Sequence, residues 1–273
     1  MRPRPALAVI VAALVLVGCG SSSEEAPQPT ATAPATTTPR DDDVLSRLPE
    51  VPAADESVRP PASSGDTDAF LNTVFDDVQA MWRQEFQAVG AQYQPATMTI
   101  FRDEVHTACG TQPAYVGPFY CPADHGVYLD DRFFDALARR AGVQLGDFAQ
   151  AFVVAHEVAH HVQVLLGITQ RVRAQDQQDP AGENARSVRL ELQADCLAGI
   201  WKHSSYQRGD LRQSDFADAL RAAAVVGSDF QQRLAGATIT PDDWTHGSSE
   251  QRQQWLTTGF EEGRPDACDT FGA

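Results

Sequence analysis

The chain has 273 residues, of which 42% are hydrophobic and 21% charged, and its formal net charge is −16. This acidic excess argues against nucleic acid as a partner, because a protein that neutralises phosphates needs basic surface. Residues 66–273 are numerous enough for one well-buried domain.

The N-terminus has the features of an export signal. Arg2 and Arg4 precede an apolar run of 12 residues, Ala6 to Val17, which is too short to span a bilayer. The run ends in Leu-Val-Gly-Cys19, which resembles a bacterial lipoprotein signal. We therefore predict a signal peptide at 1–18 and a lipid anchor at Cys19, on the extracytoplasmic face of a bacterial membrane in the cell envelope. An ordinary secretory signal with an incidental cysteine is the alternative.

Residues 19–65 have the composition of a linker. Ser, Thr, Pro, Ala and acidic residues dominate, and no apolar periodicity begins before Phe70. Such a segment has too little apolar surface to order itself. We expect a disordered tether that holds the domain at 66–273 away from the membrane.

The domain at 66–273 is predicted to be a mainly helical α+β fold with a small β-sheet. Short runs rich in β-branched and aromatic residues predict strands, and apolar residues at helical spacing predict helices. Pro118 confines the second predicted strand to a sheet edge or a bulge. The predicted strands cover 97–102, 115–121 and 127–130, and the predicted helices cover 66–89, 131–141, 147–166, 180–203, 214–226 and 249–262.

The most informative motif is His156-Glu-Val-Ala-His160 in the helix predicted between Asp147, a possible N-cap, and Gly167. Histidines four residues apart share one helix face, so both imidazoles can reach one metal ion. Glu157 lies about 100° round the helix, where it can contact a water without ligating the metal. The helix is otherwise mostly apolar, and buried histidines need partners. The motif predicts zinc-assisted hydrolysis; hydrogen-bonded core histidines are the alternative.

A third ligand is predicted in the helix at 180–203. Glu191 and Asp195 are four residues apart and share a face that borders an apolar stripe. We expect Glu191 to bind the metal and Asp195 to accept the free N–H of a ligating histidine, which would fix its tautomer. In the alternative interpretation, Glu191 is a solvated partner of Arg186 or Arg189.

The cysteines fit an exported protein. With Cys19 assigned to lipid, four remain, and an even number outside the cytoplasm predicts two disulfides with three possible pairings. We favour Cys109–Cys121, which closes a local loop, and Cys196–Cys268, which ties the C-terminus to the helix of Glu191. A cysteine ligand for zinc is the alternative.

These residues resemble a known group. HEVAHH followed by ELQAD looks like the gluzincin arrangement, and the chain is more closely similar to the bacterial putative neutral zinc metallopeptidase family over about 66–273. Ala159 departs from the glycine usual in the family pattern, and alanine is equally small and a better helix former. The matching segments are 109–110, 117–124, 127–130, 146–150, 156–163, 187–196, 245–249 and 268–271.

The resemblance implies a zincin-like, zinc-dependent peptidase with one Zn²⁺ per chain and a peptide or protein substrate. The zinc would lower the pKa of a water and polarise the scissile carbonyl, while Glu157 would act as general base. We expect His246, beside a glycine in a loop, to stabilise the oxyanion. Its alternative role is in the loop that starts the last helix, where Ser248 and Gln251 form a capping box. By analogy with zincins, the strand edge at Pro118 could pair with an extended substrate or be purely structural.

Two other functions remain open. A non-catalytic lipoprotein could keep zinc as a structural element and bind envelope partners, although a structural site normally has four protein ligands and no need of Glu157. An amidase acting on peptidoglycan peptides would use the same chemistry as a peptidase. Membrane attachment is expected through the lipid alone, because no basic patch suggests binding to anionic lipids.

Overall fold

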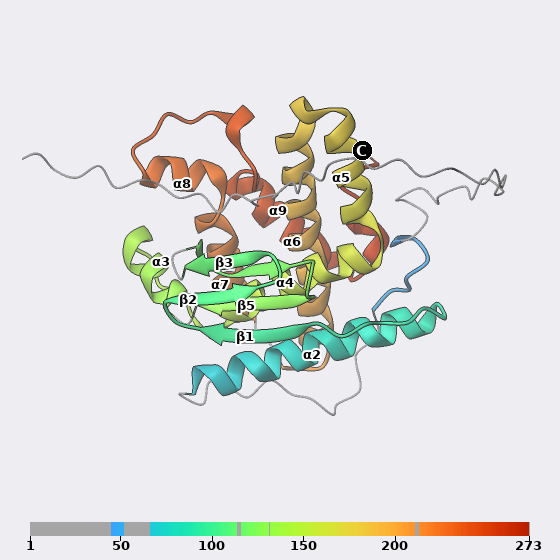
Figure 1. Cartoon of the computed structure of the whole chain (residues 1–273). Helices are drawn as coiled ribbons and strands as arrows, with labels where there is room; N and C mark the ends of the chain where they lie inside the picture. Colours follow the sequence, from blue (N-terminus) through green and yellow to red (C-terminus); the bar gives the residue numbers. More distant parts are fainter. Residues whose placement is uncertain (1–44, 52–65, 114–115, 131, 211–212, 273) are drawn as a thin grey trace, which may run out of the picture.

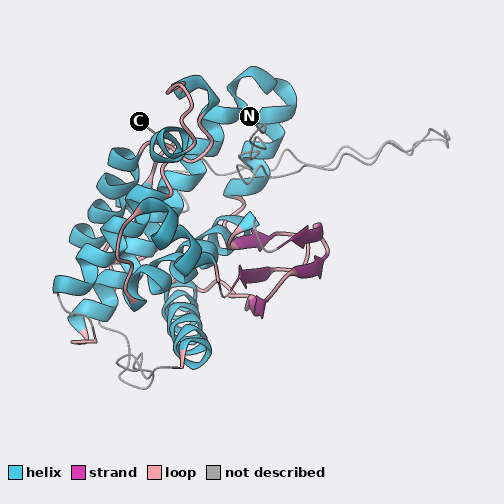
Figure 2. Cartoon of the chain, turned by 90° about the vertical axis from the view of Figure 1, so that its left-hand side faces the viewer, coloured by secondary structure: helices cyan, strands magenta, loops and turns pink. Residues whose placement is uncertain are grey.

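The fold is described from a computed structural model that covers residues 45–51, 66–113, 116–130, 132–210 and 213–272 (Figure 1). The predicted signal peptide, Cys19 and most of the predicted tether lie outside these residues. The domain is an α+β fold dominated by helices, as predicted, and Figure 2 shows the strands gathered on one side of the helices.

The first helix of the domain is α2 (Thr67–Ala88), which matches the range predicted at 66–89. Its N-cap is Asp66, whose carboxylate accepts a hydrogen bond from the Ala69 amide at 3.1 Å. One face of this helix is apolar and buried against the rest of the domain; it includes Phe70, Val74, Val78, Met81, Trp82 and Phe86.

Three short strands form a mixed sheet in the order β1-β5-β4. β1 (Thr97–Phe101) pairs in parallel with β5 (Gly126–Asp130), and β4 (Phe119–Cys121) pairs antiparallel with β5. β4 is an edge strand, as Pro118 predicts, but it begins at Phe119, so residues 116–118 of the predicted strand are not part of it. A separate hairpin of β2 (Glu104–Thr107) and β3 (Gly110–Pro113) was not predicted, because every residue of its two strands is exposed or half-buried.

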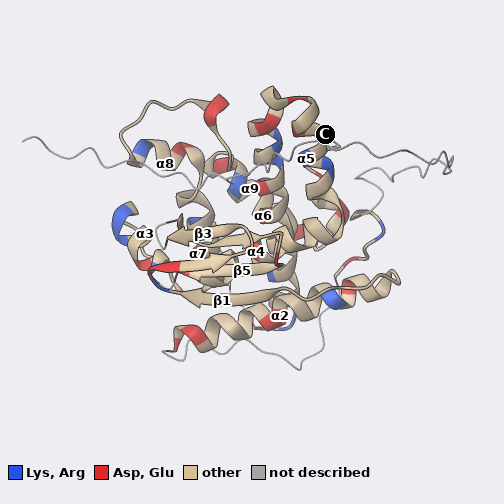
Figure 3. Cartoon of the chain, in the orientation of Figure 1, with Lys and Arg blue, Asp and Glu red and all other residues tan. Residues whose placement is uncertain are grey.

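Helices α3 and α4 follow the sheet. α3 (Phe133–Ala141) has Arg139 and Arg140 in its last turn, where they complement the helix dipole (Figure 3). α4 (Asp147–Leu165) carries the HExxH motif. The predicted N-cap at Asp147 is wrong: the cap is Gly146, whose backbone is extended, and Asp147 already lies in the first turn. Gly167 ends this helix as predicted, in a left-handed conformation.

The C-terminal half is built from helices. The range predicted at 180–203 corresponds to a 3₁₀ turn, η2 (Pro180–Gly182), followed by α6 (Glu183–Gln207). The helices predicted at 214–226 and 249–262 match α7 (Gln213–Val225) and α9 (Ser249–Glu262), and the Ser248–Gln251 capping box is present. Four further elements were not predicted: α5 (Ile168–Gln178), α8 (Ser228–Leu234), η3 (Pro241–Asp243) and η4 (Pro265–Cys268).

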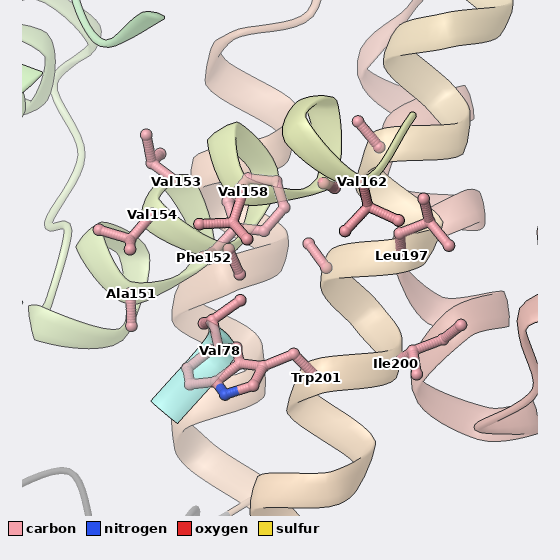
Figure 4. Close-up of a cluster of buried hydrophobic side chains, with 14 of the residues drawn as sticks. Val78, Ala151, Phe152, Val153, Val154, Val158, Val162, Leu197, Ile200 and Trp201 are labelled. Carbon is pink, nitrogen blue, oxygen red and sulfur yellow. The ribbon is translucent and has the colours of Figure 1, made fainter. Parts of the chain in front are cut away.

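Helix α4 lies at the centre of the core, in contact with α2, α6 and α7. Figure 4 shows Phe152 and Val158 of α4 near Trp201 of α6 and Val78 of α2. The tryptophan N–H donates to Asp77 of α2 at 2.7 Å, so the apolar core also contains a polar tie between helices. This packing leaves almost none of the middle of α4 exposed.

Helices α6 and α9 approach each other closely through two glycines. A Cβ added at Gly259 would overlap the backbone of Cys196, and one added at Gly199 would overlap the backbone carbonyl of Leu256. Both positions are buried within helices, so the absence of a side chain is what permits the contact. The close approach brings the first turns of α9 next to the middle of α6.

Residues 45–51 are packed against the domain, although they fall within the predicted tether. Leu45, Leu48 and Val51 are buried in the main core cluster, and the Val51 amide donates to the carbonyl of Gly263 at 3.0 Å. Three apolar side chains at a spacing of three residues provide enough apolar surface to dock, even though the neighbouring sequence is polar. The packed part of the chain therefore begins before the predicted boundary at residue 66.

The buried histidine next to the motif, His161, joins α4 to the sheet region. Its Nε2 donates to the carbonyl of Gln94 at 2.6 Å, and its Nδ1 lies 2.9 Å from the hydroxyl of Tyr120, which also contacts His125 Nδ1 at 3.0 Å. Burial lowers the pKa of His161 to about 4, so the imidazole is neutral at physiological pH. The structure thus gives His161 a buried position with hydrogen-bond partners at both ring nitrogens.

Within the part of the chain that the structure describes, no single helix combines the length and hydropathy needed to cross a membrane. Helices α4 and α5 meet those criteria only as a pair, with a bend of 75° between them.

Replacing Gly259 with alanine is expected to destabilise the domain. The new methyl group would overlap the α6 backbone, and overpacking of this kind typically costs about 1–3 kcal/mol, which exceeds alanine's advantage in helix propensity. Urea unfolding of Gly259→Ala should show this loss, whereas Gln254→Ala, at an exposed position of the same helix, should unfold like wild type. Equal stability of Gly259→Ala and wild type would contradict the close approach.

Stability should fall on acidification because of His161. Its pKa is about 6.5 in the unfolded chain and about 4 in the fold, so the unfolded state takes up a proton that the native state excludes between these values. Between pH 7 and pH 5 this linkage removes about 2 kcal/mol from the free energy of unfolding. In chelator-treated protein, urea unfolding of His161→Gln should lack this part of the pH dependence; the same slope in both proteins would refute it.

Candidate metal centre

Two helices of the core supply the predicted metal-binding residues. His156 and His160 come from α4, and Glu191 comes from the middle of α6. Because the histidines are one helical turn apart, their rings lie on the same face, with centroids 4.7 Å apart. Ala194 and Ala198 of α6 are buried, and α6 packs against α4.

The three residues present their donor atoms to one point. The Nε2 atoms of His156 and His160 are 3.1 Å apart, and they lie 3.1 and 3.4 Å from the two carboxylate oxygens of Glu191. A tetrahedral zinc ion with ligands at about 2.1 Å separates any two ligand atoms by about 3.4 Å. Two imidazoles and one carboxylate are also a donor set typical of catalytic zinc, so these residues fit the metal. Among the described residues, this is the one His, Cys, Asp or Glu group close enough to hold a metal ion.

A second carboxylate fixes the orientation of His156. Asp195 lies one turn after Glu191 on α6, and its Oδ1 is 2.9 Å from His156 Nδ1. An ionised carboxylate only accepts hydrogen bonds, so Nδ1 donates, and in the neutral imidazole Nε2 would keep its lone pair for a metal. The predicted contact between Asp195 and a histidine of the motif is therefore present.

Arg252 of α9 completes this arrangement. Its Nε and Nη2 donate to the two oxygens of Asp195, each at 2.7 Å, in a bidentate ion pair with both side chains almost completely buried. Its Nη2 is also 3.9 Å from Glu191 Oε2. The guanidinium thus balances part of the negative charge that two carboxylates bring into the core.

Electrostatics keep both carboxylates ionised. Burial alone raises the pKa of Glu191, but the imidazoles of His246, His160 and His156 together hold it well below its usual value. Burial also raises the pKa of Asp195, and Arg252 and His156 outweigh this effect and lower it. Burial lowers the pKa of His156, yet Asp195 and Glu191 raise it to about 10. A metal ion that binds at His156 Nε2 would therefore displace a proton.

The second histidine is held by a different kind of partner. His160 Nδ1 lies 2.9 Å from Gln163 Oε1, and the Gln163 amide donates to the Leu190 carbonyl and to Gln193 Oε1. Gln193 in turn donates to the backbone carbonyl of Cys268 at 3.1 Å. These contacts join the motif helix to α6 and to the C-terminal segment.

Glu157, the predicted general base, is buried beside the two histidines. Burial raises its pKa above the ordinary value, while His156 and His160 act in the opposite direction. A carboxylate with a raised pKa holds a proton more readily, which suits a group that must accept and release one. The geometry is compatible with the predicted role, which stays a prediction.

His246 lies in the loop before α9, next to the metal-binding group. Its charge interacts with Glu191, His156 and His160, and burial lowers its pKa. Its Nδ1 is 2.8 Å from the hydroxyl of Thr245, and its backbone N–H donates to Ser228 Oγ at 3.2 Å. The loop therefore serves both alternatives: it leads into the capping box of α9 and brings the imidazole to the site. Stabilisation of an oxyanion by His246 remains a prediction.

Both favoured cysteine pairings are present in the structure. Cys109 bonds to Cys121 near the strands, and Cys196 of α6 bonds to Cys268 in η4. The alternative of a cysteine ligand for zinc does not fit, because all four described cysteines are in disulfides. The second bridge starts five residues after Glu191, on the helix that carries this ligand.

Sequence reasoning missed three residues of the site. Gln163 could have been identified, because it follows His160 by three residues on one face of a buried apolar helix. Arg252 and Gln193 gave no comparable local signal. Arg252 is 57 residues from its partner Asp195, and Gln193 is 30 residues from Gln163.

Comparisons with known proteins agree with the geometry. Residues 46–271 match the family described as putative neutral zinc metallopeptidase. The uncharacterized protein YpfJ of Escherichia coli (strain K12) is 44% identical over 204 residues, which cover 74% of this chain and 71% of that protein. The uncharacterized protein Rv2575 of Mycobacterium tuberculosis (strain H37Rv) is 43% identical over 209 residues, covering 72% and 68%. No solved structure matches. The chain belongs to the putative neutral zinc metallopeptidase family.

Proposed function

We propose that this protein is a zinc-dependent peptidase held at the extracytoplasmic face of a bacterial membrane. The observation that carries the proposal is the set of three donor atoms from His156, His160 and Glu191, spaced as the ligands of one tetrahedral ion. The adjacent buried Glu157 favours a catalytic over a structural zinc site, because a structural site does not need a general base.

Each residue of the site would have a separate role in hydrolysis. The two imidazoles and Glu191 would hold the zinc, which when bound supplies an acidified water and polarises the scissile carbonyl. Glu157 would accept the proton of the attacking water and transfer it to the leaving amine. His246, in the loop before α9, would donate a hydrogen bond to the developing oxyanion. The predicted edge strand β4 offers unpaired backbone groups for an extended substrate.

The membrane location rests on the sequence of the N-terminus. The lipoprotein-like signal at 1–18 would place a lipid on Cys19, and the two disulfides are consistent with an oxidising compartment outside the cytoplasm. Membrane attachment would then come from the lipid, and the domain would act on substrates near that membrane face.

Glu157→Gln should abolish hydrolysis while the protein still binds about one zinc per chain, because the amide cannot accept the proton but the ligands are intact. Zinc content by metal analysis should be measured together with turnover of unfolded protein and of purified muropeptides. Turnover of muropeptides alone would favour the amidase alternative. Hydrolysis that survives in Glu157→Gln would remove this residue from the mechanism.

The ligand set has its own test. His156→Ala and Glu191→Ala should each lose most of the zinc, because two ligands hold the ion far more weakly than three. Glu183→Ala, at an exposed position near the start of α6, is the matched control and should keep both zinc and activity. Unchanged zinc content in the Glu191 variant would exclude it as a ligand. Zinc binding without turnover of any substrate would support the non-catalytic alternative.

The lipid anchor predicts that wild-type cells grown with labelled palmitate yield a labelled protein in the membrane fraction, and that Cys19→Ser abolishes the label. The serine variant should remain exported, because the apolar part of the signal is unchanged. Absence of label from the wild-type protein would disprove the anchor and leave an ordinary secretory signal.

A further inference from the structure

A chain of hydrogen bonds leads from the second histidine of the motif to a disulfide at the far side of α6. It runs from His160 Nδ1 to Gln163 Oε1 at 2.9 Å, from Gln163 Nε2 to Gln193 Oε1 at 3.1 Å, and from Gln193 Nε2 to the Cys268 carbonyl at 3.1 Å. Apart from His160 itself, none of these partners is a ligand or a reacting group in the proposed mechanism.

The direction of this chain is fixed at its far end. A backbone carbonyl can only accept, so the Gln193 amide must donate to Cys268 and turn its own oxygen toward Gln163. Gln163 must then donate to that oxygen, and its amide nitrogen donates also to the Leu190 carbonyl at 2.8 Å. Its oxygen is left facing His160. Since this oxygen can only accept, His160 Nδ1 must carry the hydrogen, and in the neutral imidazole Nε2 keeps its lone pair for the metal.

The chain is buried and anchored. Gln163 and Gln193 are both completely buried, so a reversed amide would leave unpaired polar groups in the core, at a cost of roughly 1–3 kcal/mol each. The Cys268 carbonyl is held in place by the bond from Cys268 to Cys196 of α6 and by the Thr270 hydroxyl, which donates to the Arg189 carbonyl at 2.8 Å. The fixed end therefore does not rely on the metal.

We propose that Gln163, Gln193 and the Cys196–Cys268 disulfide form one positioning unit that sets the tautomer and orientation of His160 and thereby the zinc affinity. The inference rests on the proposed zinc site and adds residues to it. It explains why the two histidines have different partners. Asp195 is ionised and can only accept hydrogen bonds. The side-chain amide of Gln163 has both a donor and an acceptor end, so it presents its oxygen to His160 only when Gln193 fixes its orientation.

The test is zinc affinity, measured by chelator competition on the full-length protein, with the visible spectrum of the Co²⁺-substituted protein as a readout of ligand geometry. Gln163→Leu should weaken zinc binding about 10-fold or more and change the Co²⁺ spectrum. Gln163→Glu keeps the acceptor toward His160 and should bind zinc more tightly than Gln163→Leu. Gln193→Leu should have a smaller effect than Gln163→Leu, and the two leucine substitutions should be non-additive because they interrupt the same chain.

A control separates positioning from general loss of stability. Gln79 is a buried glutamine of α2 that accepts from the Ala96 amide and the Tyr93 hydroxyl, in contacts that do not include the metal group. Gln79→Leu should lose stability like the site variants but keep wild-type zinc affinity. If all three leucine variants weaken zinc equally, or if Gln163→Leu and Gln163→Glu bind zinc with equal affinity, the role is structural and the inference is overturned.

The disulfide is tested by a matched pair. The double variant Cys196→Ala/Cys268→Ala should lower zinc affinity, whereas Cys109→Ala/Cys121→Ala, which removes the other bridge, should not. Wild-type affinity in all the variants, with zinc bound by the wild-type protein, would overturn this inference and leave the proposed function standing. A wild-type protein that binds no zinc would overturn both.

Discussion

The structure depends on the pairing of charges that are buried between three helices. Asp195 has no exposed surface, and an unpaired carboxylate in such a place would be costly. It receives two hydrogen bonds from Arg252 of α9 and one from His156 of α4. Helices α4, α6 and α9 must therefore meet at this point. The same requirement that makes the fold specific places the imidazole of His156 where a metal ligand is needed.

Small residues make this meeting possible. Gly199 and Gly259 let α6 and α9 come into backbone contact. A side chain at either glycine would overlap the backbone of the facing helix and push α6 and α9 apart. Packing and chemistry are thus coupled: the helices that give the core its density also determine the ligand spacing.

The residues of the site that could be predicted are those that lie four residues apart on one helix. His156 and His160, and likewise Glu191 and Asp195, are four residues apart, so each pair could be placed on one face from sequence alone. Their meeting in space does not follow from spacing alone: it was expected because a catalytic zinc needs a third protein ligand, and the resemblance to a family agreed with this choice. Arg252 contributes to the site through a contact of long sequence separation, and its sequence neighbours indicate only a helix start.

The same distinction applies to the fold. Long apolar periodicities gave α2, α4 and α9 close to their observed ends. Helix α5 is mostly polar, with Ile168 and Val172 as its buried residues, so no periodic signal marked it. The β2–β3 hairpin has no strictly buried residue in either strand and so lacks the alternation that identifies a strand. In both cases tertiary contacts and backbone pairing stabilise elements that local sequence preferences do not indicate.

The docking of Leu45, Leu48 and Val51 affects how far the proposed metal site could lie from the membrane. If Cys19 carries the lipid, 25 residues (20–44) connect it to the packed chain, rather than the 46 residues counted from the boundary at 66. The contour length of the connection then has an upper limit of about 85 Å, instead of about 155 Å. A shorter connection limits how far an anchored domain can move from the membrane. It would therefore favour substrates that lie in the same membrane or close to its surface.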